Sequence, residues 1–356
     1  MLKGSVVTAI GVATFAAFIG GIASLIVLLW YWRKRKPKLD EQRLQSKGEL
    51  NVSLVSLGNM YKEIIVYAFP FVMVGIANPL YTFIDQLTFN SAMAAGSQAV
   101  NYLDAYGTLS LNHKLVIIPV SLATAFAMTL VPLITESFVN DDRKILFRQL
   151  DQTIQVLLFI TLPAALGLMI LAEPFYTVFY GYSDLGTEVL RTYAPVAILF
   201  ALYSVTAAIL QGINEQRFTI LSLLTGILIK LSLNIPLIKA FGTDGAIYAT
   251  ALGYFVSIVI NLIVIKIFAK YPLRLVYRRV LLIVIFNIAM LVPVYFIYLG
   301  LHSIMNPESR LQGLLLIFIC AAIGAGIYGY LSLKSGLADR LFGERLTRVK
   351  KKLGMS

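Results

Sequence analysis

Charged residues are scarce in this chain of 356 residues, where Asp, Glu, Lys and Arg together make up 13%. That is roughly half of the share found in an ordinary soluble domain. Hydrophobic residues reach 58%, and the mean hydropathy is +0.80. A soluble domain holds only about 45–50% apolar residues. The composition therefore argues against a soluble enzyme or binding domain and predicts an integral membrane protein.

Cysteine and histidine are nearly absent as well. Cys320 is the single cysteine, so no disulfide can form within the chain. His113 and His302 lie far apart in the sequence, and neither has a second ligand three or four residues away, so no metal site is predicted. Neither a GxxxxGK[ST] phosphate loop nor a GxSxG motif occurs. We expect neither nucleotide hydrolysis nor another enzymatic activity, and no cofactor.

Long apolar runs are what the sequence has in abundance. A helix that crosses a hydrocarbon core about 30 Å thick needs about 20 predominantly apolar residues. Nine stretches meet this requirement. They are residues 5–32, 64–88, 115–134, 153–172, 190–210, 218–238, 245–268, 280–300 and 311–331. The predicted fold class is therefore all-α, a polytopic bundle of transmembrane helices.

The distribution of basic residues predicts the orientation of this bundle. Most of the 30 Lys and Arg residues follow the first, third, fifth and seventh spans or lie in the C-terminal tail. Basic connectors stay on the cytoplasmic side, so we expect an external N-terminus and a cytoplasmic C-terminus. The net charge of +12 is then explained by contact with anionic lipid headgroups and needs no nucleic acid.

Polar residues within the spans indicate candidate sites, because each is costly in hydrocarbon unless it is paired or faces water. At four-residue spacing, one face of the sixth span carries Ser222, Gly226, Lys230 and Asn234. This small, polar face should point into a bundle or a cavity. Lys230 would either line that cavity or have a structural role, as an ion pair with Asp85 or by reaching toward the headgroups.

A second polar stripe runs along the second span, where Asn78, Tyr81 and Asp85 recur at spacings of three and four. Asp85 lies near the outer end of this span. The third span starts with Lys114, and one face continues through Ser121. Lys114 and Asp85 should lie at similar depth, where they could pair. The structural alternatives are a solvated helix end for Asp85 and an interfacial anchor for Lys114.

Several of these motifs occur together in one family. The segment YGTLSLNHKLVIIPVSLATAFAMTLVPLITESF, followed by DDRKILFRQLDQT, resembles a helix of the C-terminal lobe in the multidrug/oligosaccharidyl-lipid/polysaccharide exporter superfamily. The later run ILQGINEQRFTILSLLTGILIKLSLNIPLIKAFGTDGAIYAT is similar to the polysaccharide-transporter branch. The closest resemblance is to sporulation stage V protein B-like proteins and MurJ-type lipid II flippases, and it covers essentially the whole chain.

The resemblance implies a domain arrangement, because such flippases have two six-helix lobes and two further helices. Residues 1–32 would be the last helix of a truncated N-terminal lobe and 33–63 a basic cytoplasmic linker. A six-helix C-terminal lobe would span 64–268, two additional helices 280–331, and a basic amphipathic cytoplasmic tail 332–356. The first five helices would be missing, which agrees with an external N-terminus and implies a truncated product, a mis-called start or a fragment.

The resemblance also implies a function, the flipping of an undecaprenyl-linked cell-envelope precursor by alternating access across the bacterial cell membrane. Lys114 stands where the flippases have a cavity arginine, and this implies a contact with the pyrophosphate. Lysine supplies a point charge there but lacks the bidentate fork of arginine. The expected substrate-binding residues are Lys114, Lys230, Asn234, Asn78 and Ser121. Asp85 would bind the coupling cation or proton.

The implied partners are a lipid-linked oligosaccharide, membrane lipids, a monovalent cation or proton, and a subunit that supplies the missing lobe. Two other functions stay open. A cation-coupled multidrug exporter of the same superfamily would favour acidic cavities, whereas this chain has more cations than anions in its spans. A non-transporting membrane scaffold for envelope assembly would agree with the missing helices.

Overall fold

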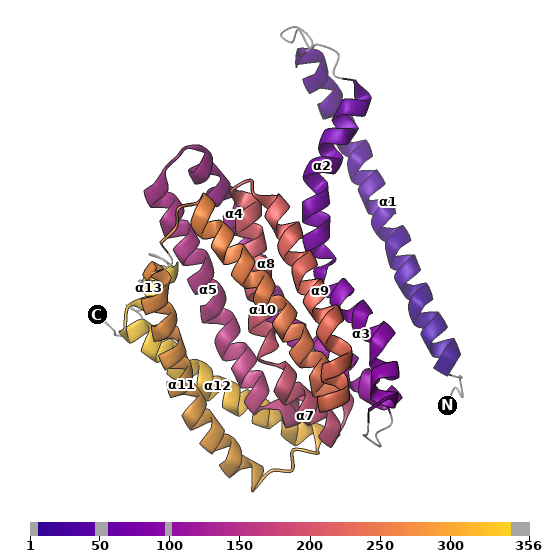
Figure 1. Cartoon of the computed structure of the whole chain (residues 1–356), viewed down its shortest axis with the longest axis vertical. Coiled ribbons are helices and arrows are strands. Elements are labelled where there is room, and N and C mark those ends of the chain that lie inside the picture. The colour runs from indigo at the N-terminus through magenta and orange to yellow at the C-terminus, as the bar shows by residue number, and fades with distance from the viewer. Residues whose placement is uncertain (1–5, 47–55, 97–101, 273, 343–356) are drawn as a thin grey trace. The chain divides into compact units, whose positions relative to one another are not determined.

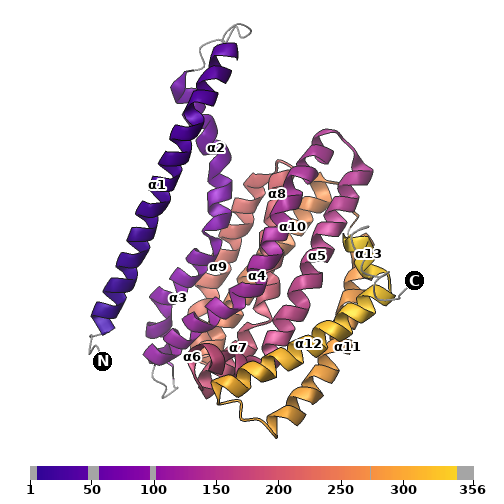
Figure 2. The ribbon, with the colours of Figure 1, turned by 180° about the vertical axis from the view of Figure 1, so that it is seen from behind.

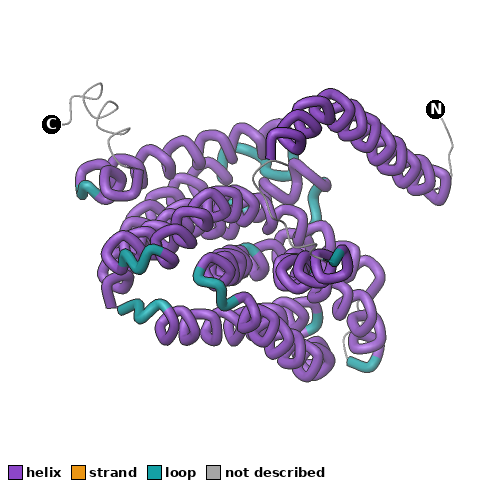
Figure 3. Tube along the Cα trace, turned by 90° about the horizontal axis from the view of Figure 1, so that it is seen from above, coloured by secondary structure: helices purple, strands orange, loops and turns teal. Residues whose placement is uncertain are grey.

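The computed structural model describes residues 6–46, 56–96, 102–272 and 274–342. Within these ranges it consists of thirteen helices and contains no strand (Figure 3). The predicted all-α fold class is therefore confirmed. In chain order the helices are α1 (Val6–Ser46), α2 (Leu57–Gly75), α3 (Ala77–Ala94), α4 (Tyr102–Val139), α5 (Arg143–Ile170), α6 (Ala172–Tyr180), α7 (Asp184–Tyr193), α8 (Val196–Gly212), α9 (Gln216–Phe241), α10 (Thr243–Phe268), α11 (Arg274–His302), α12 (Arg310–Lys334) and α13 (Leu337–Phe342).

Six helical segments in the described part of the chain are long and apolar enough to cross a membrane. They are Arg143–Ile170, Asp184–Gly212, Gln216–Phe241, Thr243–Phe268, Arg279–His302 and Arg310–Lys334. Each contains or largely overlaps one of the fourth to ninth predicted spans. The first three predicted spans also fall on helices, namely α1, α2 with α3, and α4. The chain is thus a multi-pass membrane protein, while the count of nine spans and the sidedness of the termini stay predictions.

The chain divides into two compact units, Met1–Ile64 and Ile65–Ser356. The first unit contains α1, which does not stop at the predicted span end but continues through half of the predicted linker to Ser46. Side chains four residues apart contact each other where α1 enters the predicted linker. The Lys34 ammonium lies 5.3 Å from the ring centre of Trp30, and such pairs stabilise a helix. The residues of the predicted tail beyond α13 lie outside the described ranges.

In the second unit, five long helices pack around one core. Figures 1 and 2 show α4, α5, α8, α9 and α10 side by side. The two helices α11 and α12 contact each other, and they pack against α5 and α6 respectively. The division of this unit into a six-helix lobe and an additional helix pair stays a prediction.

The predicted span 64–88 consists of two helices. α2 ends at Gly75 and α3 begins at Ala77. Pro79 accounts for the break, because it has no N–H to donate and its ring would clash with the carbonyl of Gly75, four residues earlier. A second break, at Leu171, separates α5 from the short helix α6. The short helix α6 was not predicted from the sequence, because the predicted span ended at residue 172.

Glycine residues allow α9 and α10 to approach closely. A Cβ atom on Gly226 would lie 2.2 Å from Ser257 Oγ and 2.6 Å from the carbonyl oxygen of Gly253. Gly242 joins the two helices with a φ of 61°, a conformation that favours glycine. Ser257 Oγ donates a hydrogen bond of 2.8 Å to the carbonyl of Ser222. This close packing brings the polar face of α9 against α10.

Candidate functional site

A buried ion pair lies where α3, α9 and α10 meet. Lys230 on α9 is completely buried. Its Nζ donates hydrogen bonds to Asp85 Oδ2, at 2.8 Å, and to Thr250 Oγ1, at 2.5 Å. The Asp85 side chain is only 9% exposed. The predicted burial of the Lys230 face is confirmed, since the buried residues of α9 include Ser222, Gly226, Lys230 and Asn234.

Asn234 donates a hydrogen bond to the other carboxylate oxygen of Asp85. Its Nδ2 donates to Asp85 Oδ1 at 3.1 Å and to Thr88 Oγ1 at 2.8 Å. Both oxygens of Asp85 therefore accept hydrogen bonds from α9. The Oδ1 atom of Asn234 is buried and has no hydrogen-bond partner among the described residues.

Aromatic side chains surround this ion pair. The ammonium of Lys230 lies 5.6 Å from the ring centre of Tyr81, and the Tyr81 ring lies 4.3 Å from that of Tyr254. The Tyr254 hydroxyl donates to Oδ1 of Asn78. A row of polar groups thus leads from the ion pair to Asn78.

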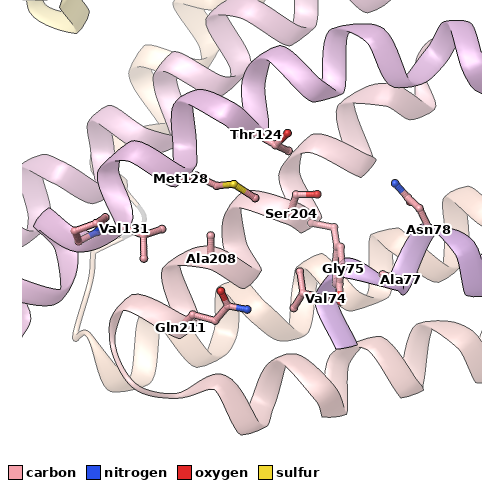
Figure 4. Close-up of a pocket in the computed structure, with 12 residues that line it drawn as sticks. Val74, Gly75, Ala77, Asn78, Thr124, Met128, Val131, Ser204, Ala208 and Gln211 are labelled. Carbon is pink, nitrogen blue, oxygen red and sulfur yellow. The ribbon is translucent and has the colours of Figure 1, made fainter. Parts of the chain in front are cut away.

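A cavity of about 450 Å³ lies beyond Asn78, between the α2–α3 break, α4 and α8 (Figure 4). None of its described lining residues is charged. The polar side chains that line it are Asn78, Thr124, Tyr203, Ser204 and Gln211. Neutral amides and hydroxyls of this kind can exchange hydrogen bonds with the hydroxyl groups of a ligand.

The six predicted site residues separate into two groups. Asp85, Lys230 and Asn234 contact one another, and Asn78 lies between them and the cavity. Lys114 and Ser121 lie on the exposed face of α4 and are not among the side chains that hydrogen-bond to the buried pair. Ser121 Oγ donates to the carbonyl of Ile118 at 2.8 Å. The partner of Asp85 is Lys230 and not Lys114, for which the described residues contain no ion pair.

Sequence reasoning missed the contribution of α10. Thr250 and Tyr254 share a face of this helix with Ser257 and Asn261, all of them buried. Their spacing of three and four residues is the same signal that identified the face of Lys230. The polar face of α10 could therefore have been found, but not its contact with α9.

Two further cavities occur in the second unit. An apolar one of about 550 Å³ is bounded by α4, α5, α6, α11 and α12. A polar one of about 450 Å³ includes Glu173 and His302. There His302 Nε2 lies 3.3 Å from Glu173 Oε2, and the hydroxyl of Tyr298 donates to the same oxygen at 2.8 Å. Tyr182 also lines this polar cavity, and the hydrogen bond that its hydroxyl donates to Asp184 raises the pKa of Tyr182 to about 12.

A bundle of membrane-crossing helices with a buried ion pair and a polar cavity is an arrangement that membrane transporters use. Residues 1–138 match the family model described as polysaccharide biosynthesis protein. The chain is 43% identical over 353 residues to the lipid II flippase MurJ of Bacillus subtilis (strain 168), an alignment that covers 97% of this chain and 64% of the flippase.

Two other proteins extend the comparison. The uncharacterized membrane protein YabM of the same strain is 23% identical over 335 residues, which cover 94% of this chain and 61% of YabM. A solved structure titled lipid II flippase MurJ, inward closed conformation, has a TM-score of 0.58 at 19% identity and covers 79% of this chain and 55% of that chain. The chain thus spans less than two thirds of the length of each of these three proteins.

These comparisons confirm the resemblance described from the motifs. The chain is similar to a lipid II flippase along nearly its whole length, and its first 138 residues match the polysaccharide biosynthesis family.

Proposed function

We propose that this chain takes part in flipping an undecaprenyl-linked cell-envelope precursor, either lipid II or a lipid-linked polysaccharide unit, by alternating access. The observation that carries the proposal is the 43% identity with a lipid II flippase along nearly the whole chain. This relative is named a lipid II flippase, so the proposed process moves a lipid and involves no catalytic residue. The bacterial cell membrane is the site of this activity.

The exposed face of α4 supports this function. Lys114, Ser121 and Met128 recur every seven residues, so they lie along one side of the helix. Lys114 supplies an accessible cation for the pyrophosphate, and Met128 lines the uncharged cavity. Sugar hydroxyls would then meet the amides and hydroxyls of the cavity wall while the lipid tail stays in the bilayer.

The buried pair supports a coupled process. Asp85 is the proposed site for a proton or a monovalent cation, and Lys230 with Asn234 forms its surroundings. A further subunit or lobe would complete the substrate cavity opposite α4. The membrane lipids and the lipid-linked oligosaccharide are the other proposed partners.

A multidrug exporter of the same superfamily is less well supported. Cationic drugs require unpaired acids in the cavity, whereas the described lining residues here are uncharged and Asp85 is neutralised by Lys230. A scaffold without transport would not depend on the charge of Lys114. The experiment below separates these alternatives.

Complementation tests the proposal. The chain is expressed in bacterial cells depleted of their lipid II flippase, both alone and together with the N-terminal helices of the Bacillus subtilis relative. We expect growth and outward exposure of lipid II to return in at least one of these two forms. The Lys114→Ala variant should lose this rescue by about tenfold or more, because a charge-assisted contact contributes roughly 1.5–3 kcal/mol.

Two further variants serve as controls. Lys114→Arg keeps the charge and should retain rescue. Lys239→Ala removes an exposed lysine from the last turn of α9 that does not line the cavity, and it should also retain rescue. Absence of rescue by every form, with the chain present in the membrane, would reject lipid II as the substrate.

A further inference from the structure

We propose that Asp85 and the anionic group of the transported molecule compete for the ammonium of Lys230, so that uptake of a proton by Asp85 opens an anion-binding site. The inference rests on the proposed function for the identity of the anion. It concerns the four side chains of Asp85, Lys230, Asn234 and Thr250, and it assigns both the coupling ion and its mode of action.

In the closed pair, Lys230 and Asp85 bind each other, and the Lys230 ammonium is not available to a ligand. Lys230 is completely buried, and its hydrogen bonds go to Asp85 and Thr250. It offers nothing to an external anion in this state. Each oxygen of Asp85 in turn accepts a hydrogen bond from a side chain of α9, and the adjacent Lys230 ammonium repels an alkali cation, so of the two proposed coupling ions the proton is favoured.

A proton changes this balance without any other reactant. A proton from water binds to one oxygen of the Asp85 carboxylate and makes it a neutral carboxylic acid. Lys230 keeps its charge, so the pair changes from net zero to a net charge of +1. A buried unpaired cation is strongly unfavourable. An anion that binds to Lys230 restores neutrality, and loss of the proton from Asp85 returns Lys230 to the closed pair and expels the anion.

Asn234 can satisfy the protonated form of Asp85. A carboxylic acid donates one hydrogen bond, which a carboxylate does not. The Oδ1 atom of Asn234 is a buried acceptor without a partner among the described residues, and it belongs to the amide that already contacts Asp85. Rotation of this amide would present Oδ1 to the new O–H group. The site thus contains an acceptor that the closed pair does not use.

Lys230 also has a route toward the cavity. Tyr81 and Tyr254 lie between the ion pair and Asn78, and Asn78 lines the cavity. Aromatic faces attract an ammonium group, so the Tyr81 ring can stabilise Lys230 as it leaves Asp85. A lysine side chain has four rotatable methylene groups, which gives it the reach for such a movement.

Other titratable groups near the pair must be separated from Asp85 in any test. Tyr81 on α3 and Tyr254 on α10 stay neutral in the range where the experiment is done. Tyr193 on α7 interacts electrostatically with Asp85, and His113 on α4 interacts with Lys230. An ordinary histidine titrates closer to the pH range of this experiment than a tyrosine does, so the His113→Gln variant is the necessary control.

The experiment measures binding of UDP-N-acetylglucosamine, a soluble pyrophosphate diester that carries a sugar, to the full chain in lipid nanodiscs. Calorimetry at about pH 6 and about pH 8 should show tighter binding at the lower pH, by up to about tenfold per pH unit for one proton taken up. Asp85→Asn should bind with one affinity at both values. His113→Gln should keep the pH dependence.

Proton uptake is measured on the unmodified chain as well, so that the test does not depend on a variant that folds. Titrations in two buffers with different heats of ionisation give the number of protons bound per anion, which should approach one. The double variant Asp85→Asn/Lys230→Met lacks both charges and should bind at least about tenfold more weakly than Asp85→Asn.

Three results would overturn the proposal. They are binding without proton uptake, a pH dependence that survives in Asp85→Asn, and absence of binding in both the unmodified chain and Asp85→Asn. The outcome is independent of complementation. If the chain rescues growth but binds the anion without taking up a proton, the flippase function stands and the competition is rejected. If it binds the anion with proton uptake but does not rescue growth, the competition stands and the flippase function is rejected.

Discussion

At the residue scale, Lys230 is stable inside the bundle because Asp85, Thr250 and the ring of Tyr81 surround its ammonium group. Removing one partner of a buried ion pair leaves an uncompensated charge and costs roughly 3–5 kcal/mol, whereas replacing both partners together is often nearly neutral. The energy of this site therefore depends on the pair and not on either residue alone.

A double-mutant cycle tests this dependence. We expect Lys230→Met to lower the free energy of unfolding by roughly 3–5 kcal/mol, and Asp85→Asn/Lys230→Met to restore most of that loss. Thermal unfolding in detergent gives the comparison. If the double variant is as unstable as the sum of the two single variants, the pair is not energetically coupled.

The sequence predicted the face of Lys230 and offered Asp85 as one possible partner, but it could not decide whether Asp85 pairs with Lys230 or with Lys114. Spacing of four residues along α9 is enough to place Ser222, Gly226, Lys230 and Asn234 on one side of a helix. Which neighbouring helix meets that side depends on packing between residues more than a hundred positions apart, such as Lys230 with Asp85. The depth of Asp85 and Lys114 alone could not decide between the two lysines.

At the element scale, the contact between α9 and α10 fixes the geometry of the site. Gly226 and Gly253 bring the two backbones together and thereby set the distance between Lys230 and Thr250. The chain also interrupts its long helices at defined residues, as at Ile76, three residues before Pro79. Span prediction averages over about 20 residues, and for that reason it found the apolar segments but missed the α2–α3 break and α6.

A glycine substitution tests the role of close packing. Gly226→Ala should lower the free energy of unfolding by roughly 1–3 kcal/mol, because its Cβ would overlap the backbone of Gly253 and the side chain of Ser257. Gly167→Ala on α5 is the matched control, since its Cβ would meet no atom within 4 Å. Equal thermal stability of the two variants would contradict the proposed packing.

At the scale of the whole molecule, composition alone was enough to predict a multi-pass helical membrane protein, and the described helices agree with it. The motifs indicated a resemblance to lipid II flippases, and the 43% identity to one of them confirms that resemblance. The assignment of Lys114 to the substrate and of Asp85 to a coupling ion goes further than either comparison. These roles depend on which side chains line an open cavity. The spacing of polar residues along single helices does not predict that.

The central claim is that this chain moves a lipid-linked anionic precursor with the help of Lys114 on α4. The most direct test is translocation of fluorescent lipid II in proteoliposomes, with the chain alone and with the N-terminal helices of its relative. We predict movement across the bilayer in at least one form, slowed by about tenfold or more in Lys114→Ala and unchanged in Lys239→Ala. Movement no faster than in protein-free vesicles, for every form, would contradict the account.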